Sequence, residues 1–504
     1  KSLPFGLMLG FWASPFTTSP RALMPLLAAT LAAAIAAGAV LSSRRRRGVT
    51  KQQQLVGGPK VVSTCVVRPA KGGPADEVLV SAQDALMARL PLWASGYPAY
   101  GFGFAVAPDP DRVTAALAEV LSIWRIFAGR FRGDGKAIVL SDEGMPFALL
   151  EAAAPLEGEE AMWRCADFRR GAGALFGHEP LATATLTRFP DGSGVLTVCR
   201  SHGLGDGATL AMFVADWSKA IAGKTLEPIK LDRSVCKPTG LSEEEVVAEV
   251  ERSLGRPVVK RSVAKRFMTN VAFRLMAEID LVRLSLGGVA SAPRPRLLLS
   301  HAELASLKDR ASEDLKTVPW ISTQEAFIAL LLLALPSFFN KGPKVSLLLW
   351  LDARRYLGEA GKRLVSGTAI LTEDFHFHVE GKSLSQLAEE VHIKLEAFGK
   401  EEARKAFFMA QGLFEYNVDT PLGPPKAWKL KDADVKIMLN NQSKLPLVDL
   451  GSGPAEWVCS TSGPTLMVPH KDGTTVLFDS GTVPGGKAGC LPSGLEEKLR
   501  SLCS

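Results

Sequence analysis

Three patterns follow one another in 196-LTVCRSHGLGDGATLAMFVADWSKAIAGK-224: a strand-like apolar run, a glycine-rich turn and a helix-like run. The turn holds His202, one of only seven histidines in 504 residues, and the pair Asp206 and Gly207. The apolar side chains of the helix-like run recur at three- and four-residue spacing, at Leu210, Phe213, Trp217 and Ile221. The stretch therefore predicts a strand, a turn and an amphipathic helix, with His202 where the strand ends.

A histidine in this position has a chemical and a structural interpretation. Near pH 7 a neutral imidazole can take a proton from a hydroxyl or an amine that attacks a carbonyl group. Asp206, one turn later, would then fix the local geometry. In the structural interpretation the histidine is buried and satisfied by the backbone, and Asp-Gly is an ordinary turn into a helix. The HxxxDG pattern alone does not decide between the two.

The rest of the chain predicts two mixed α/β halves joined by a crossing segment. In the first half we expect helices at 112–131 and 207–222 and strands at 137–140, 147–152, 181–189 and 195–201. In the second half we expect strands at 345–353 and 368–379, helices at 322–335, 383–398 and 493–502, and a capping box of Ser300 with Glu303. The charged, proline-containing segment 224–265 looks like a linker that carries one exposed helix. The expected domains are 76–223 and 296–504, with a crossover linker at 224–295.

The positive charge of the chain is concentrated at its beginning. Of the 59 Lys and Arg residues, ten lie before Asp76, which is the first acidic residue. The rest of the chain contains 49 basic and 52 acidic residues. The body therefore gives no electrostatic reason to expect a nucleic-acid partner. The seven cysteines are scattered without a CxxC pair, which argues against a disulfide scaffold or a zinc site and favours a reducing compartment.

Residues 1–75 are expected to form a leader outside the catalytic fold. The apolar run 22-ALMPLLAATLAAAIAAGAVL-41 precedes four arginines at 44–47, and 37-AGA-39 resembles a small-residue cleavage site. A cleaved presequence that directs the protein to a plastid or another organelle explains the whole acid-free block. The alternative is a retained anchor in the endoplasmic reticulum membrane, which would be the only membrane contact of the protein.

Four further segments occur in an order that matches a known family. They are 127-FAGRFRGDGKAIVLSDEGMPFALLEA-152, 320-WISTQEAFIALLL-332, 351-LDARRYL-357 and 444-KLPLVDLGSGPAEWV-458. Together with HGLGDG they resemble the motifs of the BAHD (HXXXD) acyltransferases over about residues 80–504. This resemblance implies a coenzyme A-dependent acyltransferase-like fold of two similarly sized mixed α/β domains around a central channel.

The resemblance also implies an activity. BAHD enzymes of secondary metabolism move an acyl group from acyl-CoA, a co-substrate, to a hydroxyl or amine of a small-molecule acceptor, without a bound cofactor or metal. A monomer is expected. His202 matches the general base, and Asp206 matches the structural acid that pairs with Arg354. Gly207 lets the helix begin close to the thioester, and Asn440 or its neighbour Asn441 would donate a hydrogen bond to the oxyanion.

Several positions depart from the family pattern. The family's DFGWG is 449-DLGSG-453 here, its GNA is 367-GTA-369, and its Thr-Ser-Trp is 440-NNQ-442. The first change bears on domain packing and the last on substrate positioning. Two other kinds of protein therefore remain open: a non-catalytic ligand-binding relative, and a carrier-protein-dependent condensation enzyme. The latter usually has a second histidine where this chain has Ser201.

Three weaker candidates do not indicate a site of their own. Asp374, His376 and His378 alternate along one predicted strand face, where three such groups can ligate a metal, but a solvated strand face is the commoner arrangement. Cys199 lies on the strand face opposite His202, which argues against a Cys-His pair. The glycine-rich 481-GTVPGGKAG-489 lacks a strand-loop-helix frame and is expected to be a surface loop.

Overall fold

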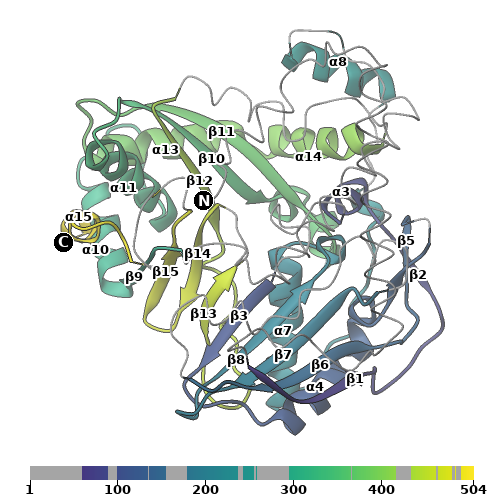
Figure 1. Cartoon of the computed structure of the whole chain (residues 1–504). Coiled ribbons are helices and arrows are strands. Elements are labelled where there is room, and N and C mark those ends of the chain that lie inside the picture. Colours follow the sequence, from purple (N-terminus) through teal and green to yellow (C-terminus); the bar gives the residue numbers. More distant parts are fainter. Residues whose placement is uncertain are drawn as a thin grey trace, which may run out of the picture. The chain divides into compact units, whose positions relative to one another are not determined.

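Figure 1 shows the computed structural model of the protein. The described residues are 59–88, 99–133, 135–154, 179–236, 242–254, 257, 294–364, 366–415, 433–460, 464–479, 483 and 490–503. All of them belong to one compact unit, formed by residues 57–419 and 424–504. No helix in this described part is long and apolar enough to cross a membrane. The predicted presequence or anchor at 22–41 lies outside the described residues.

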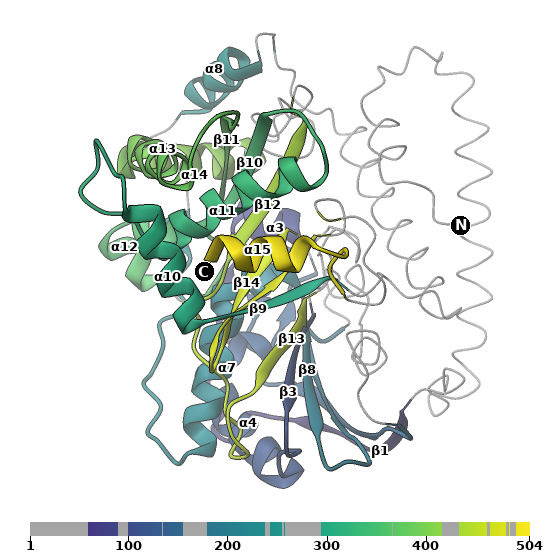
Figure 2. The same ribbon diagram turned by 90° about the vertical axis from the view of Figure 1, so that its left-hand side faces the viewer.

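The first of two six-stranded sheets carries the strand that leads to His202. Its order is β1 (Lys60–Val67), β6 (Met145–Glu151), β7 (Ala182–Arg188), β8 (Gly194–Arg200), β3 (Ala99–Phe104) and β13 (Glu456–Ser460). Only the β6–β7 pair is parallel. Figure 2 shows α4 (Pro110–Ile123) and α7 (Gly207–Ile221) together on one face of this sheet. A small sheet of β2 (Glu77–Leu79), β5 (Ala137–Val139) and β4 (Arg130–Phe131) accompanies it.

Aromatic rings fill the space between these two helices. Phe127, from the turn after α4, stacks on Phe213 of α7 with ring centroids 4.0 Å apart. Trp124 meets both rings edge to face, and all three side chains are fully buried. The apolar stripe read in 207–222 is therefore core, and it fixes the position of α7 and of the turn that precedes it.

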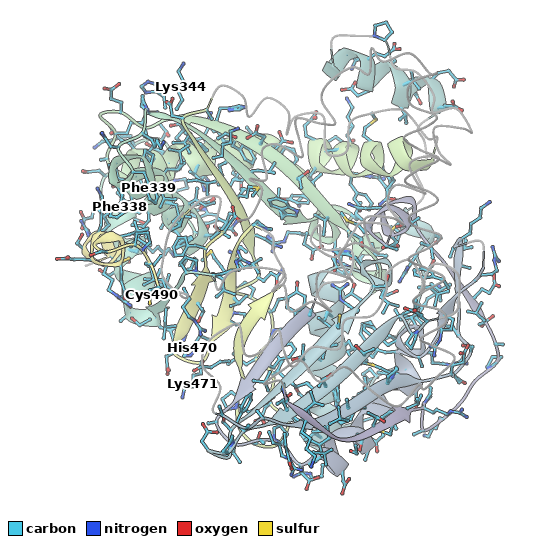
Figure 3. All side chains as sticks on the ribbon, viewed as in Figure 1. Phe338, Phe339, Lys344, His470, Lys471 and Cys490 are labelled. Atoms are coloured by element: carbon cyan, nitrogen blue, oxygen red, sulfur yellow. The ribbon has the colours of Figure 1, made fainter. Side chains whose placement is uncertain are left out.

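The second sheet is built from the later part of the chain. Its order is β11 (Ile370–His378), β10 (Lys344–Asp352), β12 (Val435–Asn441), β14 (Thr465–His470), β15 (Gly473–Leu477) and β9 (Arg296–Ser300). A second hydrophobic cluster joins it to α10 (His301–Ser312), α11 (Thr323–Phe338), α13 (Leu384–Phe398) and α15 (Leu495–Cys503). The C-terminal end of α11 is marked by the edge-to-face rings of Phe338 and Phe339 (Figure 3).

Most of the expected elements are present. The capping box of Ser300 and Glu303 is confirmed, with each side chain bonded to the other residue's backbone N–H. The exposed helix of the linker is α8 (Glu243–Leu254). The helix predicted at 112–131 is shorter in the structure. Helix α4 ends at Ile123, and a short turn and strand β4 follow.

The predicted boundaries need two corrections. Strand β1 lies within the segment assigned to the leader, yet it pairs along its length with β6, so the fold begins by Lys60 and not at residue 76. Strand β13 lies within the predicted second domain, 296–504, yet it pairs with β3 at the edge of the first sheet. The two halves are therefore not separate continuous stretches of chain.

The longest helix that the sequence did not predict lies late in the chain. The segment after Gly399 forms α14 (Lys400–Glu415), which contacts α3 (Ala82–Met87) of the first half. Its buried positions include Gln411, whose side-chain N–H bonds to Gln83 Oε1 at 3.2 Å and whose Oε1 accepts from the Gln83 backbone N–H at 3.2 Å.

Candidate active site

The turn between β8 and α7 presents His202 from a rigid frame. Residues His202–Leu204 form one short 3₁₀ turn, and the Ser201 hydroxyl accepts a hydrogen bond from the Gly203 N–H at 3.3 Å. Gly205 has φ 147°, which disfavours any residue with a side chain, and a Cβ there would lie 2.4 Å from Thr209 Oγ1. The sequence thus makes a sharp turn that only glycine allows, directly after the histidine.

Asp206 caps α7 and faces an arginine from the second half of the chain. Its Oδ1 accepts from the Thr209 N–H at 3.0 Å, and its Oδ2 accepts from the Ala369 N–H at 3.0 Å. The Arg354 guanidinium donates to both oxygens, at 2.7 and 3.2 Å. Burial pushes the pKa of this carboxyl up, but the adjacent Arg354 charge and the hydrogen bonds outweigh it and hold the pKa well below its usual range.

Arg354 joins the predicted motif 351-LDARRYL-357 to the histidine turn. Besides Asp206 it donates to the carbonyl oxygens of Gly367 at 2.7 Å and Leu364 at 2.8 Å, and to the carboxylate of Asp352 at 3.0 Å. Burial lowers the pKa of Arg354, but the two carboxylates outweigh it, so the pKa is raised. The structure therefore brings Asp206 and Arg354 together as a two-pronged ion pair, which is the arrangement that the resemblance implies.

A second buried ion pair was missed in the sequence. Arg233, on the segment after α7, donates to Asp84 Oδ2 at 3.2 Å, and both side chains are almost fully buried. Its Nη1 and Nη2 also donate to the carbonyl oxygens of Gly203 at 3.1 Å and Leu204 at 2.7 Å. This pair therefore holds the turn of His202 through Gly203 and Leu204, in addition to the pair of Asp206 and Arg354.

Both carboxylates also fix the segment 366–369, which contains the family's altered GNA position. The Thr368 N–H donates to Asp84 at 2.6 Å, and the next N–H, from Ala369, donates to Asp206. A single parallel β-bridge between Gly205 and Gly367 continues the contact. The site is thus formed where a turn of the first half meets a segment of the second. The central channel expected beside it stays a prediction.

The His202 side chain is buried and uncharged. It is 8% exposed, and its Nδ1 lies 3.4 Å from the Thr368 hydroxyl. Burial, followed by the positive charge of Arg200, lowers the pKa of His202 to about 4, although Asp206 opposes this shift. At neutral pH the ring is therefore uncharged, which is the form that can accept a proton.

Gly207 and Gln442 lie close to each other at the start of α7. A Cβ on Gly207 would lie 2.9 Å from Gln442 Nε2 and 3.1 Å from the Tyr100 hydroxyl. The Gln442 side-chain oxygen is buried and has no hydrogen-bond partner within the described part of the chain. A buried amide oxygen without a partner can accept a hydrogen bond from a polar group of a substrate.

The asparagines predicted for the oxyanion are placed differently. Asn440 lies in β12, aligned with Trp350 and Leu466 of the neighbouring strands. Asn441 donates to Gln324 at 3.1 Å and accepts from Ser443, so its side chain is occupied within the fold. The role of Asn440 stays a prediction, and Gln442 is the residue of 440-NNQ-442 that the structure brings to Gly207.

The altered DLGSG segment still closes a turn. Asp449 Oδ1 accepts from the N–H groups of Gly451 at 2.8 Å and Gly453 at 3.1 Å. Leu450 is buried in the first hydrophobic cluster, and the Asp449 N–H donates to Ser218 of α7 at 3.2 Å. Leu450 therefore anchors the segment in the core, the Asp449–Ser218 bond attaches it to α7, and these contacts are structural.

The weaker candidates form no second site. Asp374 accepts from the Ser346 hydroxyl at 2.6 Å and lies 3.4 Å from the exposed His376. No group of three His, Cys, Asp or Glu side chains that could hold a metal ion occurs among the residues described. Cys199 is buried in β8 opposite Ala99 and Thr183. The glycine-rich 481–489 lies outside the described residues except Val483.

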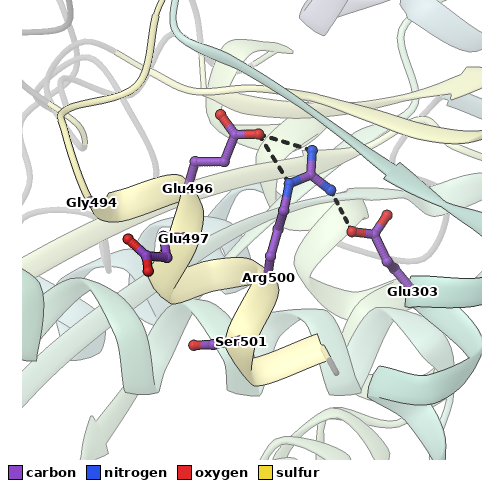
Figure 4. Close-up of a pocket in the computed structure, with 6 residues that line it drawn as sticks. All are labelled: Glu303, Gly494, Glu496, Glu497, Arg500 and Ser501. Carbon is purple, nitrogen blue, oxygen red and sulfur yellow. Dashed lines mark hydrogen bonds and ion pairs between the residues drawn. The ribbon is translucent and has the colours of Figure 1, made fainter.

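A surface pocket elsewhere has the wrong chemistry for coenzyme A. It lies between α10 and α15 and is lined by Glu303, Gly494, Glu496, Glu497, Arg500 and Ser501 (Figure 4). Three carboxylates line it, and Arg500 is engaged in ion pairs with Glu303 and Glu496. Its negative balance disfavours phosphate groups.

Comparison with known proteins gives a weak sequence match and a clear fold match. No family model matches the chain. A segment of 119 residues is 29% identical to pelargonidin 3-O-(6-caffeoylglucoside) 5-O-(6-O-malonylglucoside) 4'''-malonyltransferase of Salvia splendens, a BAHD enzyme. The match spans 23% of this chain and 28% of that relative.

Solved structures cover most of the chain. Vinorine synthase superposes with a TM-score of 0.54 at 13% identity, over 83% of this chain and 94% of that one. TRI101 of F. graminearum, solved with coenzyme A and T-2 mycotoxin, gives a TM-score of 0.55 at 16% identity, over 81% and 96%. The first condensation domain of the calcium-dependent antibiotic synthetase gives 0.53 at 14% identity, over 85% and 97%.

These comparisons bear out the resemblance read from the motifs. Vinorine synthase and TRI101 are BAHD acyltransferases, and the chain has their two-domain, mixed α/β fold of the coenzyme A-dependent acyltransferases. At such low identities the likeness concerns the fold, and the chemistry must be argued from the site itself.

Proposed function

We propose that this protein is an acyltransferase that moves an acyl group from acyl-CoA to a hydroxyl or an amine of a small molecule, with His202 as general base. The observation that carries the proposal is the neutral His202, held between two buried ion pairs where the two halves of the chain meet. The fold shared with BAHD acyltransferases and the coenzyme A bound in a TRI101 structure support it.

The site has the groups that a direct acyl transfer, without an acyl-enzyme intermediate, requires. The hydroxyl or amine of the acceptor attacks the thioester carbonyl while His202 takes its proton. The resulting tetrahedral oxyanion collapses, the C–S bond breaks, and the thiolate of coenzyme A receives that proton from the imidazolium. The thioester supplies the activation. The two ion pairs hold the base in place, which preserves its orientation through the reaction.

Polar groups beside the turn would bind the developing charge. The Gln442 Nε2 group lies beside Gly207 and is the part of that amide that would donate to the oxyanion. The start of α7 adds backbone N–H groups of the kind that bind anions. Asn440 stays the alternative oxyanion donor. Together they would lower the barrier by stabilising the oxyanion.

The condensation-domain likeness keeps one second candidate open, in which the acyl group arrives on a carrier protein. Ser201 stands where such enzymes usually have another histidine, and this favours coenzyme A. A mixed assay separates them: acyl-CoA and the same acyl group on a phosphopantetheinyl carrier protein are offered with equal acceptor. Turnover of the carrier thioester alone would show that the protein is a carrier-protein-dependent condensation enzyme.

The test of the proposed base is acceptor-dependent thiol release from a panel of acyl-CoAs with alcohol and amine acceptors. Because a positioned base contributes about 10²–10⁴ in rate, His202→Ala should lower kcat by roughly that factor. His378→Ala, at an exposed position of β11, is the matched control and should leave the rate unchanged.

Equal rates in wild type and His202→Ala would remove the histidine from the mechanism. No release with any donor would favour the non-catalytic relative. A comparison of alcohol and amine products by mass spectrometry would distinguish O-acylation from N-acylation.

We also propose that the leader directs the protein to a plastid or another organelle. A fluorescent protein fused to residues 1–58 should enter the organelle and be shortened there. Retention of the full length in an endoplasmic reticulum membrane fraction would instead establish the anchor. Such a fusion leaves β1, and with it the fold, out of the test.

A further inference from the structure

Arg200 is a buried charge that the proposed mechanism has not used. It is the last residue of β8, two positions before His202, and its side chain is fully buried. The Nη1 group donates to the carbonyl oxygen of Gly205 and lies 3.5 Å from that of Ser201. The Nε and Nη2 groups have no hydrogen-bond partner among the described residues.

The other two arginines of this cluster are paired. Arg233 has Asp84, and Arg354 has Asp206 together with the partly exposed Asp352. Arg200 forms no ion pair with any carboxylate in the described part of the chain. Its favourable electrostatic neighbours are, in order, Tyr100, Asp206, Cys199 and Asp84. One guanidinium beside the proposed base is therefore left without a counter-ion.

An unpaired buried charge is costly. Moving a charged group out of water without a partner costs several kcal/mol even after relaxation, and buried charges are almost always paired. Two pKa shifts reflect this cost. Burial lowers the pKa of Arg200, and the charge of Arg200 helps to lower the pKa of His202. A residue of this kind needs a counter-ion, and none of the described residues supplies one.

We propose that Arg200 binds a carboxylate carried by one of the two substrates, either on the acyl group or on the acceptor. This inference rests on the proposed function, because it places the carboxylate next to the reacting carbonyl. A guanidinium with two unoccupied nitrogens matches the planar, two-oxygen geometry of a carboxylate. The chemical class is thus a dicarboxylic acyl thioester or an acidic alcohol or amine.

The phosphates of coenzyme A do not fit this position. They lie at the far end of the pantetheine arm from the thioester, whereas Arg200 lies two residues from the base that works on the thioester. A carboxylate within the acyl group, or within the acceptor bound to His202, is the anion that can reach the arginine while the reaction proceeds.

The experiment compares matched substrates in wild type, Arg200→Met, Arg200→Lys and a control. Malonyl-CoA and butyryl-CoA are donors of similar length with and without the charge, and tyrosine and tyramine are acceptors with and without it. Arg188→Met is the control, because Arg188 lies on the adjacent β7, with a side chain 39% exposed. Melting temperatures show whether each variant is folded.

We expect wild type to prefer one charged substrate over its neutral partner by at least about tenfold in kcat/KM, since an ionic hydrogen bond is worth about 1.5–3 kcal/mol. Arg200→Met should abolish that preference, Arg200→Lys should keep part of it, and Arg188→Met should leave it unchanged. The charged donor or the charged acceptor, whichever shows the effect, identifies the source of the carboxylate.

Two results would overturn the inference: equal use of charged and neutral substrates by wild type, or a preference that persists in Arg200→Met. In both, turnover would still uphold acyl transfer. If no variant turns over any substrate, dialysis binding decides separately. Tighter binding of malonyl-CoA than butyryl-CoA, or of tyrosine than tyramine, lost only in Arg200→Met, would support the carboxylate site. No such difference would overturn it. If Arg200→Met fails to fold, the same comparisons are made with Arg200→Lys, whose ammonium lacks the planar fork; a preference as large as in wild type would then overturn the inference.

Discussion

At the scale of single residues, the proposed mechanism makes the charge state of His202 set the pH range of activity. Burial and then Arg200 lower its pKa to about 4, so the ring stays neutral at pH values where a free histidine would be protonated. The acid limb of kcat/KM should therefore fall near pH 4 instead of pH 6.5. Initial rates of thiol release between about pH 3 and pH 8 measure this limb.

The same pH profile separates charge from structure at Arg200. The groups that act on His202 are Arg200 from β8 and Asp206 at the cap of α7, with Arg354, Asp84 and Arg233 around them. Arg200→Met removes a positive charge that lowers the pKa of His202, so the acid limb should move upward towards pH 6.5. An unmoved limb in a folded variant would show that Arg200 does not act on His202.

Asp206 is predicted to stabilise the fold as well as the site. Removing one partner of a buried ion pair leaves the other charge uncompensated, so Asp206→Asn should lower the free energy of unfolding by about 3 kcal/mol at pH 7. Because the folded pKa lies below the unfolded one, this contribution is present above the usual carboxyl pKa and is lost as the pH falls through the folded value.

Urea unfolding followed by circular dichroism at pH 7 and pH 3 measures both parts of this prediction. Asp352→Asn is the matched control, since that carboxylate contacts the same Arg354 but is 37% exposed, and its loss should be much smaller. Equal stability of Asp206→Asn and wild type would contradict the role of the pair.

At the scale of elements, the turn between β8 and α7 depends on one glycine. Gly205→Ala should destabilise the protein by about 1–3 kcal/mol, because it combines a φ of 147° with a Cβ that meets Thr209. Gly192→Ala is the control: φ there is 84°, but nothing lies within 4 Å of the new Cβ. Thermal unfolding should show the larger loss for Gly205→Ala, together with reduced activity from the displaced histidine.

The elements that the sequence predicted well are those whose apolar period is unbroken. The run around 207–222 became α7, and 345–353 became β10, because each carries one continuous apolar face. Helix α14 was missed because its buried face includes Gln411, a polar side chain whose partner Gln83 lies far away in the sequence. Periodicity cannot report burial that depends on a distant hydrogen bond.

The same limit applies to the site. Asp206 and Arg354 could be paired in advance because each lies in a motif that the family shares. Asp84 and Arg233 lie in no such motif and are 149 positions apart, so only the folded chain shows that they meet. The unpaired state of Arg200 is likewise a property of its surroundings.

At the scale of the whole molecule, the first sheet needs chain from outside the predicted domain 76–223 at both ends. Strand β1 precedes that range and strand β13 follows it. Strand β1 is mostly exposed but covers the edge of β6. A chain that starts at Pro59 should keep the stability of the full-length protein. A chain that starts at Asp76 should melt a few degrees lower and aggregate more readily, because β6 becomes an open edge.

Differential scanning fluorimetry and light scattering on the two truncated chains measure this difference. Identical melting and solubility would show that β1 adds nothing to the sheet. Loss of folding in the chain that starts at Pro59 would show that residues 1–58 belong to the catalytic fold after all.

The return of β13 to the first sheet has a consequence for synthesis on the ribosome. Strands β3 and β8 leave the ribosome long before Glu456–Ser460 exists, so the nascent first half carries an uncovered strand edge at β3. Asp206 also lacks its ion-pair partner until Arg354 is translated, 148 residues later. The half that carries the histidine is therefore incomplete while it is being made, and we expect chaperones to protect it until translation is nearly finished.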